Sequence, residues 1–581
     1  MKYLQRFVSA HAATLFGILV WLLLSMELLA LHKAIRTDFV FVHTVMSLSE
    51  CALIMLPYWW LRGRMRAAVL VLAWGFSILM LCEIIYYRFW NQLIPLNLFS
   101  QAANANGILL GSAIGKLRRA DLMFAAGAVV PTALYCLPAV RRAVTGEKYT
   151  LRMRIGTTAL ICLAFATVQV AAARRVLRDD HHRPHDFINA VRSICHEYAA
   201  PNAFHVLRHY TNFSWFGLLP QYIMEISDHI RAEGEFTLTD SERAGISRYL
   251  SGHEACPIRE NRGKNLVFII VESLDAEVIG LTVNGAEITP VMNALAADST
   301  SLCSTAMLTQ AGIGVSSDGQ LIYNTGLLPL RRQPAAANIV PELDRLPAFA
   351  SRFDDSYTCV AVFTDDGVGW NKNAAYGRYG YDRVITSDAY KPLMQAAAGP
   401  DGALLQYAAA LADTLAQPFY MQLLTIQMHD PYVDKGFRPA ADYSGTGISA
   451  ERQRYLNCTA EFDRELGRFI DSLRHSGLWD NTVLAIASDH CSIPIIKADG
   501  EPGRIVFIAA GCGRGMRVEH TTQQVDVFPT LLDIMGVDSD YRGVGRSMLC
   551  AASAGTSDTR RASVSDSILR SDYFRAAAPE R

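Results

Sequence analysis

The segment GIGVSSDGQ, from Gly312 to Gln320, holds two adjacent serines and an aspartate after a run of small residues. A serine hydroxyl is a weak nucleophile at neutral pH unless a neighbouring base or cation activates it. Elsewhere the chain offers two carboxylates and an imidazole, Glu272, Asp489 and His490, which suit Mn²⁺, Mg²⁺ or Zn²⁺. A divalent ion held by them would lower the pKa of a hydroxyl and offset negative charge on a phosphoryl oxygen. The residue types therefore indicate a metal-assisted nucleophile, with one of the two serines in that role.

Short apolar runs in the second half of the chain would position these residues. Five of them have the composition of strands buried on both faces, and longer mixed segments, such as residues 451–477, read as helices between them. This alternation predicts an α/β domain with a mostly parallel sheet and helices on both faces. The expected strands are residues 265–273, 357–365, 419–427, 482–489 and 504–511.

Polar residues follow several of these expected strands. Glu272 ends the first, His429 and Asp430 follow the third, and Asp489 and His490 end the fourth. A carboxylate at a strand end is often only a helix cap, so no single one of these residues defines a site. In open α/β sheets, however, ligands bind outside the carboxyl ends of the strands. The joint placement predicts one site there, with the serine segment joining it from between the first two strands.

The first part of the chain is far more hydrophobic than the rest. A soluble buried helix is the alternative for any one apolar run, but five runs in succession, each close to the roughly 20 residues that cross a bilayer, favour a membrane domain. The first run lacks a convincing signal-peptide cleavage site. The five expected spans are Ala12–Leu31, Phe39–Leu61, Ala67–Trp90, Asp121–Val140 and Ile155–Ala173.

Basic residues set the expected orientation. They gather between spans two and three, in Arg62–Arg66, and between spans four and five, in Arg141–Arg154, so both loops should be cytoplasmic. Everything after Ala173 is then extracytoplasmic, on a multi-pass protein of the cytoplasmic membrane. The chain's 54 Lys+Arg nearly balance its 55 Asp+Glu, so bulk charge gives no reason to expect a nucleic-acid partner.

Four regions follow from this pass along the chain. Residues 1–173 are a five-helix transmembrane domain, 174–260 a juxtamembrane linker, 261–550 the catalytic domain, and 551–581 a polar tail expected to be disordered or a loose cap. His181, His182 and His185 in the linker could bind metal, but a solvated linker is the favoured interpretation.

The catalytic part resembles the alkaline phosphatase and sulfatase superfamily, and the whole chain resembles lipoteichoic acid synthase-type phosphotransferases, which have five spans, a linker and an extracellular catalytic domain. The resemblance rests on four motifs in order: VES at 271–273, GVSSD at 314–318, MHDP at 428–431 and SDH at 488–490. The run Gln524–Gly536 is similar to the family's closing helix.

The resemblance implies the roles of the site residues. Aligning GVSSD with the family's Gly-Lys-Thr-Ser-Asp places the nucleophile at Ser316, which would contact one metal ion together with Glu272, Asp489 and His490. Mn²⁺ is favoured, with Mg²⁺ and Zn²⁺ as alternatives. Serine replaces the usual threonine and keeps the hydroxyl, whereas Val315 replaces the lysine and removes a cation near the phosphate.

The same resemblance implies where the substrate binds. The segment WNK falls where related synthases have Trp-Asn-Arg, so Trp370 and Lys372 would hold the headgroup, with a point charge in place of a bidentate arginine. His429 would be a catalytic acid or electrophile near the donor and acceptor phosphates and would also contact the substrate.

The implied reaction moves a phospholipid headgroup phosphate, either glycerol phosphate or phosphoethanolamine, to an extracytoplasmic glycan, glycolipid or polymer. It would pass through a phospho-serine intermediate, and the bilayer would supply the donor. Hydrolysis to water and a non-catalytic membrane sensor remain the alternatives. The spans hold few internal charges, mainly Glu27, Glu50 and Glu83, which is fewer than a transport pathway usually has.

Other members of the superfamily are less well matched. A sulfatase needs a convertible residue in C/S-x-P-x-R, and CPIR at Cys256–Arg259 has the wrong spacing and precedes the first strand. A second metal ion would have Asp365, Asp366 and His520 as its candidates, each more typical of a loop. The eight cysteines after the spans could pair in an oxidising compartment or remain buried thiols.

Overall fold

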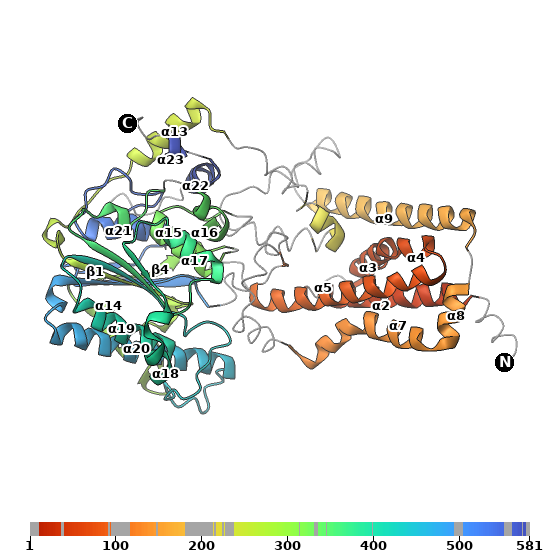
Figure 1. Cartoon of the computed structure of the whole chain (residues 1–581), viewed down its shortest axis with the longest axis horizontal. Helices are drawn as coiled ribbons and strands as arrows, with labels where there is room; N and C mark the ends of the chain where they lie inside the picture. The colour runs from red at the N-terminus through yellow and green to blue at the C-terminus, as the bar shows by residue number, and fades with distance from the viewer. Residues whose placement is uncertain are drawn as a thin grey trace. The chain divides into compact units, whose positions relative to one another are not determined.

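The computed structural model (Figure 1) describes most of the chain. The described residues are 11–35, 40–90, 93–94, 117–146, 149–179, 213, 216–223, 226, 237–312, 314–330, 335–343, 346–397, 399–492, 503–550, 560–571 and 573–576. The chain divides into two compact units, one of Met1–Leu96 with Ala113–Gly234 and one of Asn97–Ser112 with Glu235–Arg581. His181, His182 and His185 of the linker lie outside the described residues.

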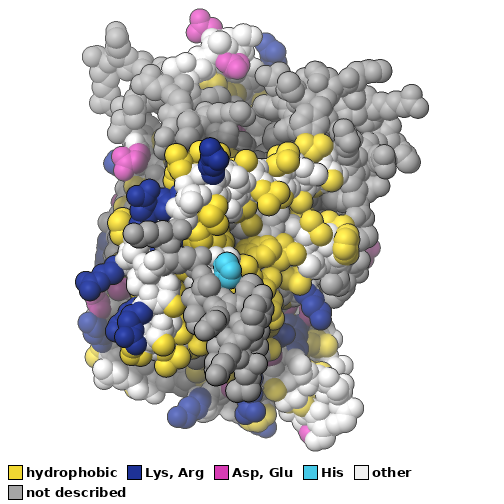
Figure 2. Space-filling model, turned by 90° about the vertical axis from the view of Figure 1, so that its right-hand side faces the viewer, with side chains coloured by type: hydrophobic (Ala, Val, Ile, Leu, Met, Phe, Trp, Pro, Cys, Tyr) yellow, Lys and Arg dark blue, Asp and Glu magenta, His cyan; other side chains and the backbone are white. Residues whose placement is uncertain are grey.

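The first unit is helical and apolar. Its elements are α2 (Ala12–Ile35), α3 (Val40–Ile54), α4 (Leu56–Trp60), η1 (Gly63–Ala67), α5 (Ala68–Trp90), η3 (Arg119–Ala125), α7 (Ala126–Cys136), α8 (Pro138–Gly146) and α9 (Leu151–Asp179). Figure 2 shows hydrophobic side chains gathered on the face that it views, with lysine and arginine side chains around them. Large hydrophobic side chains are also exposed along the helices, among them Met26 of α2, Val71 of α5 and Leu160 of α9, as suits helices whose outer faces meet lipid.

Three described helical segments are long and apolar enough to cross a membrane: Ala12–Ile35, Gly63–Arg88 and Leu151–Ala172. The fourth expected span bends by 96° between Arg119–Cys136 and Pro138–Gly146. Its Pro138 cannot donate the backbone hydrogen bond that would continue the helix. The second expected span is shorter than predicted, because α3 ends at Ile54 and α4 begins at Leu56. The structure thus confirms apolar helices at the expected places without confirming five spans.

The two basic loops lie at one end of the helical unit. Arg66 Nη1 donates to the Val144 carbonyl at 2.7 Å, and Arg154 Nη1 donates to the Trp60 carbonyl at 3.1 Å. Arg66 is also within cation–π distance of Tyr149, at 4.5 Å from the ring centroid. The loop after α4 and the loop around α8 are therefore neighbours, as the orientation by basic residues requires.

The three carboxylates inside the helices hold the unit together. Glu27 of α2 accepts from Ser77 Oγ at 2.8 Å and from the Gly127 amide at 2.6 Å. Glu50 of α3 accepts from the Leu218 amide at 3.1 Å, and Glu83 of α5 accepts from the Tyr222 hydroxyl. The described residues 216–223 of the linker are thus bound to the helical unit through two of these carboxylates.

The second unit contains a nine-stranded sheet in the order β10-β4-β9-β8-β1-β7-β5-β6, with β11 paired to β4, and a small β2–β3 hairpin. The strands are β1 (Asn265–Val271), β2 (Thr282–Val283), β3 (Ala286–Glu287), β4 (Leu302–Leu308), β5 (Thr358–Phe363), β6 (Arg383–Ile385), β7 (Phe419–Leu424), β8 (Thr482–Ser488), β9 (Arg504–Ala510), β10 (Met516–Val518) and β11 (Thr522–Gln523). All five strands expected from the sequence are present.

The sheet is mixed: β9 runs in the opposite direction, whereas the strand pairings that do not involve β9 are parallel. Strand β9 runs antiparallel to both of its neighbours, β8 and β4, while the central β8, β1, β7 and β5 are parallel. The reversed strand β9 follows β8 in the chain after residues 489–503. The central parallel strands still bring their carboxyl ends to one edge.

Helices cover both faces of this sheet (Figure 1), as predicted. One layer holds α14, α18, α19 and α20, and the other holds α15, α16, α17 and α21. The helices of this unit up to α21, including α13 before the sheet, are α13 (Asp240–Ser251), α14 (Pro290–Ala297), α15 (Ser316–Thr325), α16 (Ala335–Asn338), α17 (Lys372–Tyr376), α18 (Lys391–Ala396), α19 (Pro400–Ala412), α20 (Ala450–His475) and α21 (Val527–Ile534). The 3-10 turns are η4 (Arg259–Asn261), η5 (Ala276–Val278), η6 (Val340–Glu342), η7 (Ala350–Arg352), η8 (Gly369–Asn371), η9 (Ser387–Tyr390), η10 (Trp479–Asn481) and η11 (Gln524–Asp526).

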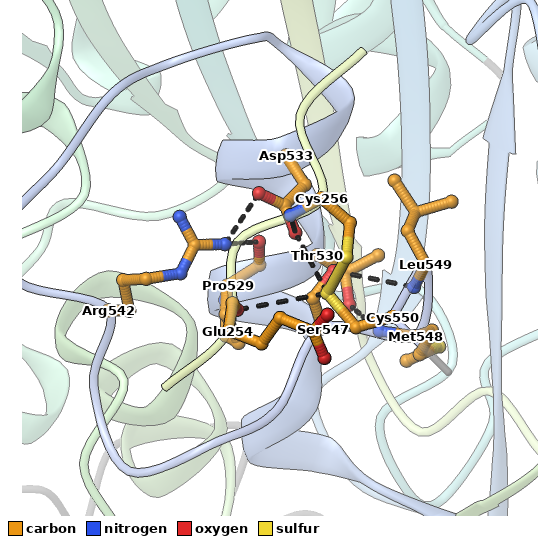
Figure 3. Close-up of a disulfide and its surroundings, with 10 residues drawn as sticks. All are labelled: Glu254, Cys256, Pro529, Thr530, Asp533, Arg542, Ser547, Met548, Leu549 and Cys550. Carbon is orange, nitrogen blue, oxygen red and sulfur yellow. Dashed lines mark hydrogen bonds and ion pairs between the residues drawn. A yellow bond between two sulfur atoms is a disulfide. The ribbon is translucent and has the colours of Figure 1, made fainter. Parts of the chain in front are cut away.

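A disulfide joins the segment before β1 to the segment after α21 (Figure 3). Cys256 and Cys550 are bonded across a sequence separation of 294 residues. Asp533 of α21 accepts from the Cys256 amide at 3.0 Å and from Arg542 Nη2 at 2.6 Å. The disulfide therefore sits in a hydrogen-bonded cluster that fixes the chain entering the sheet to the chain leaving it.

Part of the tail, expected to be disordered or a loose cap, is helical. Residues Arg560–Arg570 form α22 and Tyr573–Ala576 form α23. Arg561 of α22 is buried and forms an ion pair with Asp526 at 3.0 Å, and Ile568 and Leu569 are also buried. The helix α22 thus anchors the tail to the catalytic unit.

Candidate active site

The parallel strands bring four predicted site residues to one edge of the sheet. Val271 of β1 pairs with Ser488 of β8, and Ile270 pairs with Leu424 of β7. Glu272 and Asp489, the next residues of β1 and β8, are therefore neighbours. The Glu272 amide donates to Thr425 Oγ1 at 2.9 Å, which fixes the end of β1 against the end of β7.

Glu272, Asp489 and His490 form a buried cluster. His490 Nε2 lies 3.3 Å from Glu272 Oε1 and 3.6 Å from Asp489 Oδ2. His490 Nδ1 donates to the Cys491 carbonyl at 2.7 Å, which orients the ring with Nε2 toward the carboxylates. One ligand atom from each of the three lies within 4.8 Å of the others, a spacing that could hold a metal ion.

Burial and the neighbouring charges shift the pKa values of all three side chains in this cluster. Burial, together with the Glu272 charge, raises the pKa of Asp489 to about 7. Burial opposes the charged form of His490, but the Asp489 and Glu272 carboxylates outweigh it and raise the pKa of that imidazole to about 9. Burial also opposes ionisation of Glu272, yet contact with His490 holds its pKa well below the usual value. Two buried carboxylates side by side are a fitting site for a cation.

Ser316 faces this cluster. Its Oγ donates to Glu272 Oε2 at 3.0 Å and lies 3.2 Å from His490 Nε2. Ser316 is half-buried and is the first residue of α15, so partial positive charge of the helix also favours an anion beside it. Ser317 is buried and donates to the Gly314 carbonyl at 2.6 Å. The geometry thus distinguishes the two serines: Ser316, the one that the family resemblance implies, faces the cluster, and Ser317 bonds within the turn.

A strained turn presents Ser316. Val315 has φ 47° and ψ −113°, a conformation that β-branched residues rarely adopt. Asp318 Oδ2 accepts from the Gly312 and Gly314 amides, each at 2.9 Å, and holds the turn closed. Burial raises the pKa of Asp318 to about 7 despite these bonds. A Cβ on Gly314 would lie 2.3 Å from Asp318 Oδ1, so the turn needs glycine there.

Two residues that the sequence analysis does not single out as site residues, Gln524 and Gly319, contact Asp489. We call the segment Asp489–His490, which carries two proposed metal ligands, the metal-ligand loop. Gln524 Nε2 donates to the Asp489 carbonyl at 2.6 Å, and its Oε1 accepts from the Gln310 amide at 2.8 Å. Gly319 packs so closely that a Cβ there would lie 2.3 Å from the same Asp489 carbonyl. Both residues belong to motifs already singled out, but their contacts join segments between 35 and 214 residues apart and leave no local signal.

His429 lies after β7 at the same edge. It is half-buried, and its Nδ1 donates to the Asp430 carbonyl at 2.6 Å. The buried Asp401 at the start of α19 accepts from the Ile426 amide at 2.9 Å and so holds the loop that carries His429. The loop is thus fixed by a carboxylate far away in sequence.

Trp370 and Lys372 lie beyond the end of β5. Asn371 Nδ2 donates to the Ala337 carbonyl of α16 at 3.2 Å, and α16 packs on α15, so this segment adjoins the nucleophile helix. Lys372 Nζ is ion-paired with Asp365 and lies 5.3 Å from the centre of the Phe363 ring. The lysine expected to meet the headgroup therefore already has a carboxylate partner.

The competing sites are not assembled in the described part of the chain. Asp365 pairs with Lys372, Asp366 Oδ1 accepts from the Val368 amide at 3.0 Å, and His520 is exposed. None of these three belongs to a cluster of metal-ligating side chains among the described residues. Cys256 of the CPIR segment is in the disulfide and so is no free sulfatase-type nucleophile.

Comparisons with known proteins match both units. Residues 264–537 match the family model described as Sulfatase, and residues 1–209 match the one described as Lipoteichoic acid synthase N-terminal domain. The chain is 24% identical to lipoteichoic acid synthase 2 of Bacillus subtilis (strain 168) over 514 residues, which cover 83% of this chain and 74% of that protein. The two domains thus occur in the expected order.

Two further comparisons are more limited. Lipoteichoic acid synthase 1 of Bacillus subtilis (strain 168) is 26% identical over 335 residues, 52% of this chain, and the chain spans about half of its length (51%). The crystal structure of the lipoteichoic acid synthase LtaP from Listeria monocytogenes has 18% identity and a TM-score of 0.46, covering 54% of this chain and 82% of that one.

Proposed function

We propose that this chain, a lipoteichoic acid synthase-like protein with a sulfatase-type domain, is a membrane-anchored, metal-dependent phosphotransferase. The observation that carries the proposal is the accessible hydroxyl of Ser316, within 3.2 Å of both Glu272 and His490. The relatives named as lipoteichoic acid synthases support a glycerol phosphate donor before phosphoethanolamine. The same site could in principle release the group to water.

Glu272, Asp489 and His490 would hold one divalent ion, and Ser316 would complete its ligands. Mn²⁺ is our first choice, with Mg²⁺ and Zn²⁺ as alternatives, because the donors combine two carboxylates, a hydroxyl and an imidazole. When bound, the ion would lower the pKa of the hydroxyl and offset charge on the phosphoryl oxygens. His490 must lose its Nε2 proton to take part.

The chain's own groups would then carry two displacements. Ser316 Oγ, having released its proton to solvent, would form a bond to phosphorus while the bond from phosphorus to the diacylglycerol oxygen breaks, and it would leave again as the alkoxide in the second displacement. His429 supplies the proton that the diacylglycerol leaves with, and Trp370 with the Lys372–Asp365 pair holds the headgroup. An acceptor hydroxyl next displaces Ser316 Oγ from phosphorus and gives its proton back through His429. The acceptor is a glycan, a glycolipid or a growing polymer.

The membrane unit would place the site beside its donor. We propose five crossings, in which α3 and α4 together form one, since residues 40–60 reach about 30 Å as a helix. The basic loops lie together at one end, which we assign to the cytoplasm. The catalytic unit is then extracytoplasmic, and the Cys256–Cys550 disulfide suits such an oxidising compartment. Anchoring raises the effective concentration of lipid donor at the site.

The test uses the purified full-length protein in detergent or nanodiscs, supplied with labelled phosphatidylglycerol or phosphatidylethanolamine and one metal at a time. Mass spectrometry of the products should show diacylglycerol and a phosphorylated acceptor. Free glycerol phosphate in place of the phosphorylated acceptor would identify a hydrolase. No turnover of either lipid with any metal would refute the proposal and favour a sensor.

A further inference from the structure

The catalytic unit exposes few large hydrophobic side chains. Among its described residues, only Val368 and Val433 are exposed, at 62% and 66%. Every other exposed large hydrophobic side chain of the described residues lies at residue 226 or earlier, in the helical unit. Single exposed apolar residues are common and need no explanation. Val368 and Val433, however, follow two adjacent strands of the sheet.

Both valines follow adjacent strands at the edge that carries the candidate active site. Val368 lies after β5 and Val433 after β7, and these strands pair in parallel up to Phe363 and Leu424. Val433 follows His429 by four residues, and Val368 precedes Trp370 by two. The two loops that supply the proposed substrate contacts therefore also carry the unit's exposed apolar side chains.

The loops are held firmly, so the exposure is built into the fold. On one side of Val433, Arg454 Nε donates to the Pro431 carbonyl at 3.3 Å, and on the other Asn457 Nδ2 donates to Asp434 at 2.8 Å. The Val368 amide donates to Asp366 Oδ1 at 3.0 Å, and its carbonyl accepts from the Asn371 amide at 3.0 Å. Both valines are thus presented to the outside by anchored backbone.

Charges beside the Val433 loop point to the occupant. Lys435 and Arg438 are exposed, whereas the intervening acid Asp434 is half-buried and bonded to Asn457. An apolar tip next to exposed cations, with a tryptophan on the companion loop, is the composition of a surface that sits in the headgroup layer of an anionic bilayer. A polymer or protein acceptor rich in carboxylates or phosphates would use the cations but not the valines.

We propose that Val368 and Val433 enter the headgroup layer of the bilayer, with Lys435 and Arg438 against anionic lipid phosphates. The edge bearing Ser316 then faces the membrane, and a donor lipid reaches the site without leaving the bilayer. This inference rests on the proposed function for its purpose. The contact itself is a property of the surface and is tested without turnover.

The first experiment measures the contact directly. A photo-crosslinking amino acid is placed at Val368, at Val433 or at Asp480 in the full-length protein, reconstituted in vesicles of phosphatidylglycerol and phosphatidylcholine. Asp480 is the matched control, because it is exposed and precedes β8 at the opposite edge of the sheet. Lipid adducts should form at both valine positions at least tenfold more than at position 480. Adducts to protein instead, or equal lipid labelling at all three positions, would overturn the proposal.

The second experiment uses the pair Val368→Asp and Val433→Asp in one protein, with Val368→Thr and Val433→Thr as the near-isosteric control. With donor in the bilayer, kcat/KM of the Asp pair should fall roughly 10- to 30-fold. This is the effect expected when two valine side chains lose partial burial in the headgroup layer. With a water-soluble short-chain donor it should stay within about twofold, and the Thr pair should lie between the Asp pair and the unmodified protein. An equal loss on both donors would contradict membrane contact. If the unmodified protein turns over neither donor, the proposed function fails, while the crosslinking result still decides the contact.

Discussion

Gly319 offers a direct test of how closely the nucleophile helix must pack on the metal-ligand loop. It lies in α15, and a Cβ there would lie 2.3 Å from the Asp489 carbonyl oxygen and 2.8 Å from its carbon. Ordinary contacts of this kind are about 3.4 Å, so Gly319→Ala must push the two segments apart by about 1 Å. The displaced backbone carries one proposed metal ligand, and the displaced helix carries Ser316.

The expected loss of activity is much larger than the loss of stability. A misplacement of about 1 Å in a catalytic group lowers the rate roughly 100-fold. Overpacking destabilises by about 1–3 kcal/mol, but alanine gains about 1 kcal/mol over glycine in a helix. The net effect on the free energy of unfolding should thus be a loss of about 0–2 kcal/mol. Metal affinity should fall as well.

Gly245→Ala is the matched control, since Gly245 lies in α13 with no atom within 4 Å of the added Cβ. It should stabilise the protein by up to about 1 kcal/mol and leave kcat unchanged. Thermal unfolding, metal content after dialysis and lipid turnover are measured for both variants. If Gly319→Ala keeps full activity and metal content, the close packing of α15 on the metal-ligand loop is not needed for catalysis and the reasoning is wrong.

Three further predictions concern the nucleophile, the metal and the disulfide. Ser316→Ala should reduce turnover by about 10⁴-fold or more, whereas Ser317→Ala, which loses only a bond within the turn, should reduce it about tenfold; a headgroup-phosphate adduct found on Ser317 by mass spectrometry would reverse the assignment. Chelation should abolish turnover and Mn²⁺ should restore it, and the model of the site does not survive if metal-free protein, verified by elemental analysis, keeps its activity. Replacing Cys256 and Cys550 together by serine should lower the free energy of unfolding by about 2–5 kcal/mol and leave kcat unchanged at low temperature, so an unaltered melting temperature would show that the crosslink is not formed.

Much of the catalytic fold could be predicted because its signals are local. The five long buried strands are continuous apolar runs, and the polar residues that end β1 and β8 meet because parallel strands align their carboxyl ends. The sequence therefore predicts that Glu272, Asp489 and His490 lie together. The strand β4 was missed because its sequence, LCSTAML, mixes polar residues into a short run.

What could not be predicted depends on contacts between distant residues. The antiparallel direction of β9 has no signal in its composition, because its apolar run has the same pattern as the parallel strands. The family resemblance, not the local sequence, distinguishes Ser316 from Ser317, and neither the strained dihedral at Val315 nor the pairing of Lys372 with Asp365 has a local signal. The length of α3 depends on a break that no hydropathy window detects.

The Cys256–Cys550 bond has a consequence for how the protein is made. Its two halves are separated by 294 residues, so at about 5–20 residues per second Cys256 waits roughly 15–60 s for its partner to be synthesised. Five cysteines are synthesised between the two bonded ones, and each is buried in the finished domain: Cys303, Cys359, Cys458, Cys491 and Cys512. Each is a wrong partner that arrives before the right one. Biogenesis therefore depends on burying these thiols early, or on an oxidoreductase that reshuffles them, before the bond can close around an almost complete sheet.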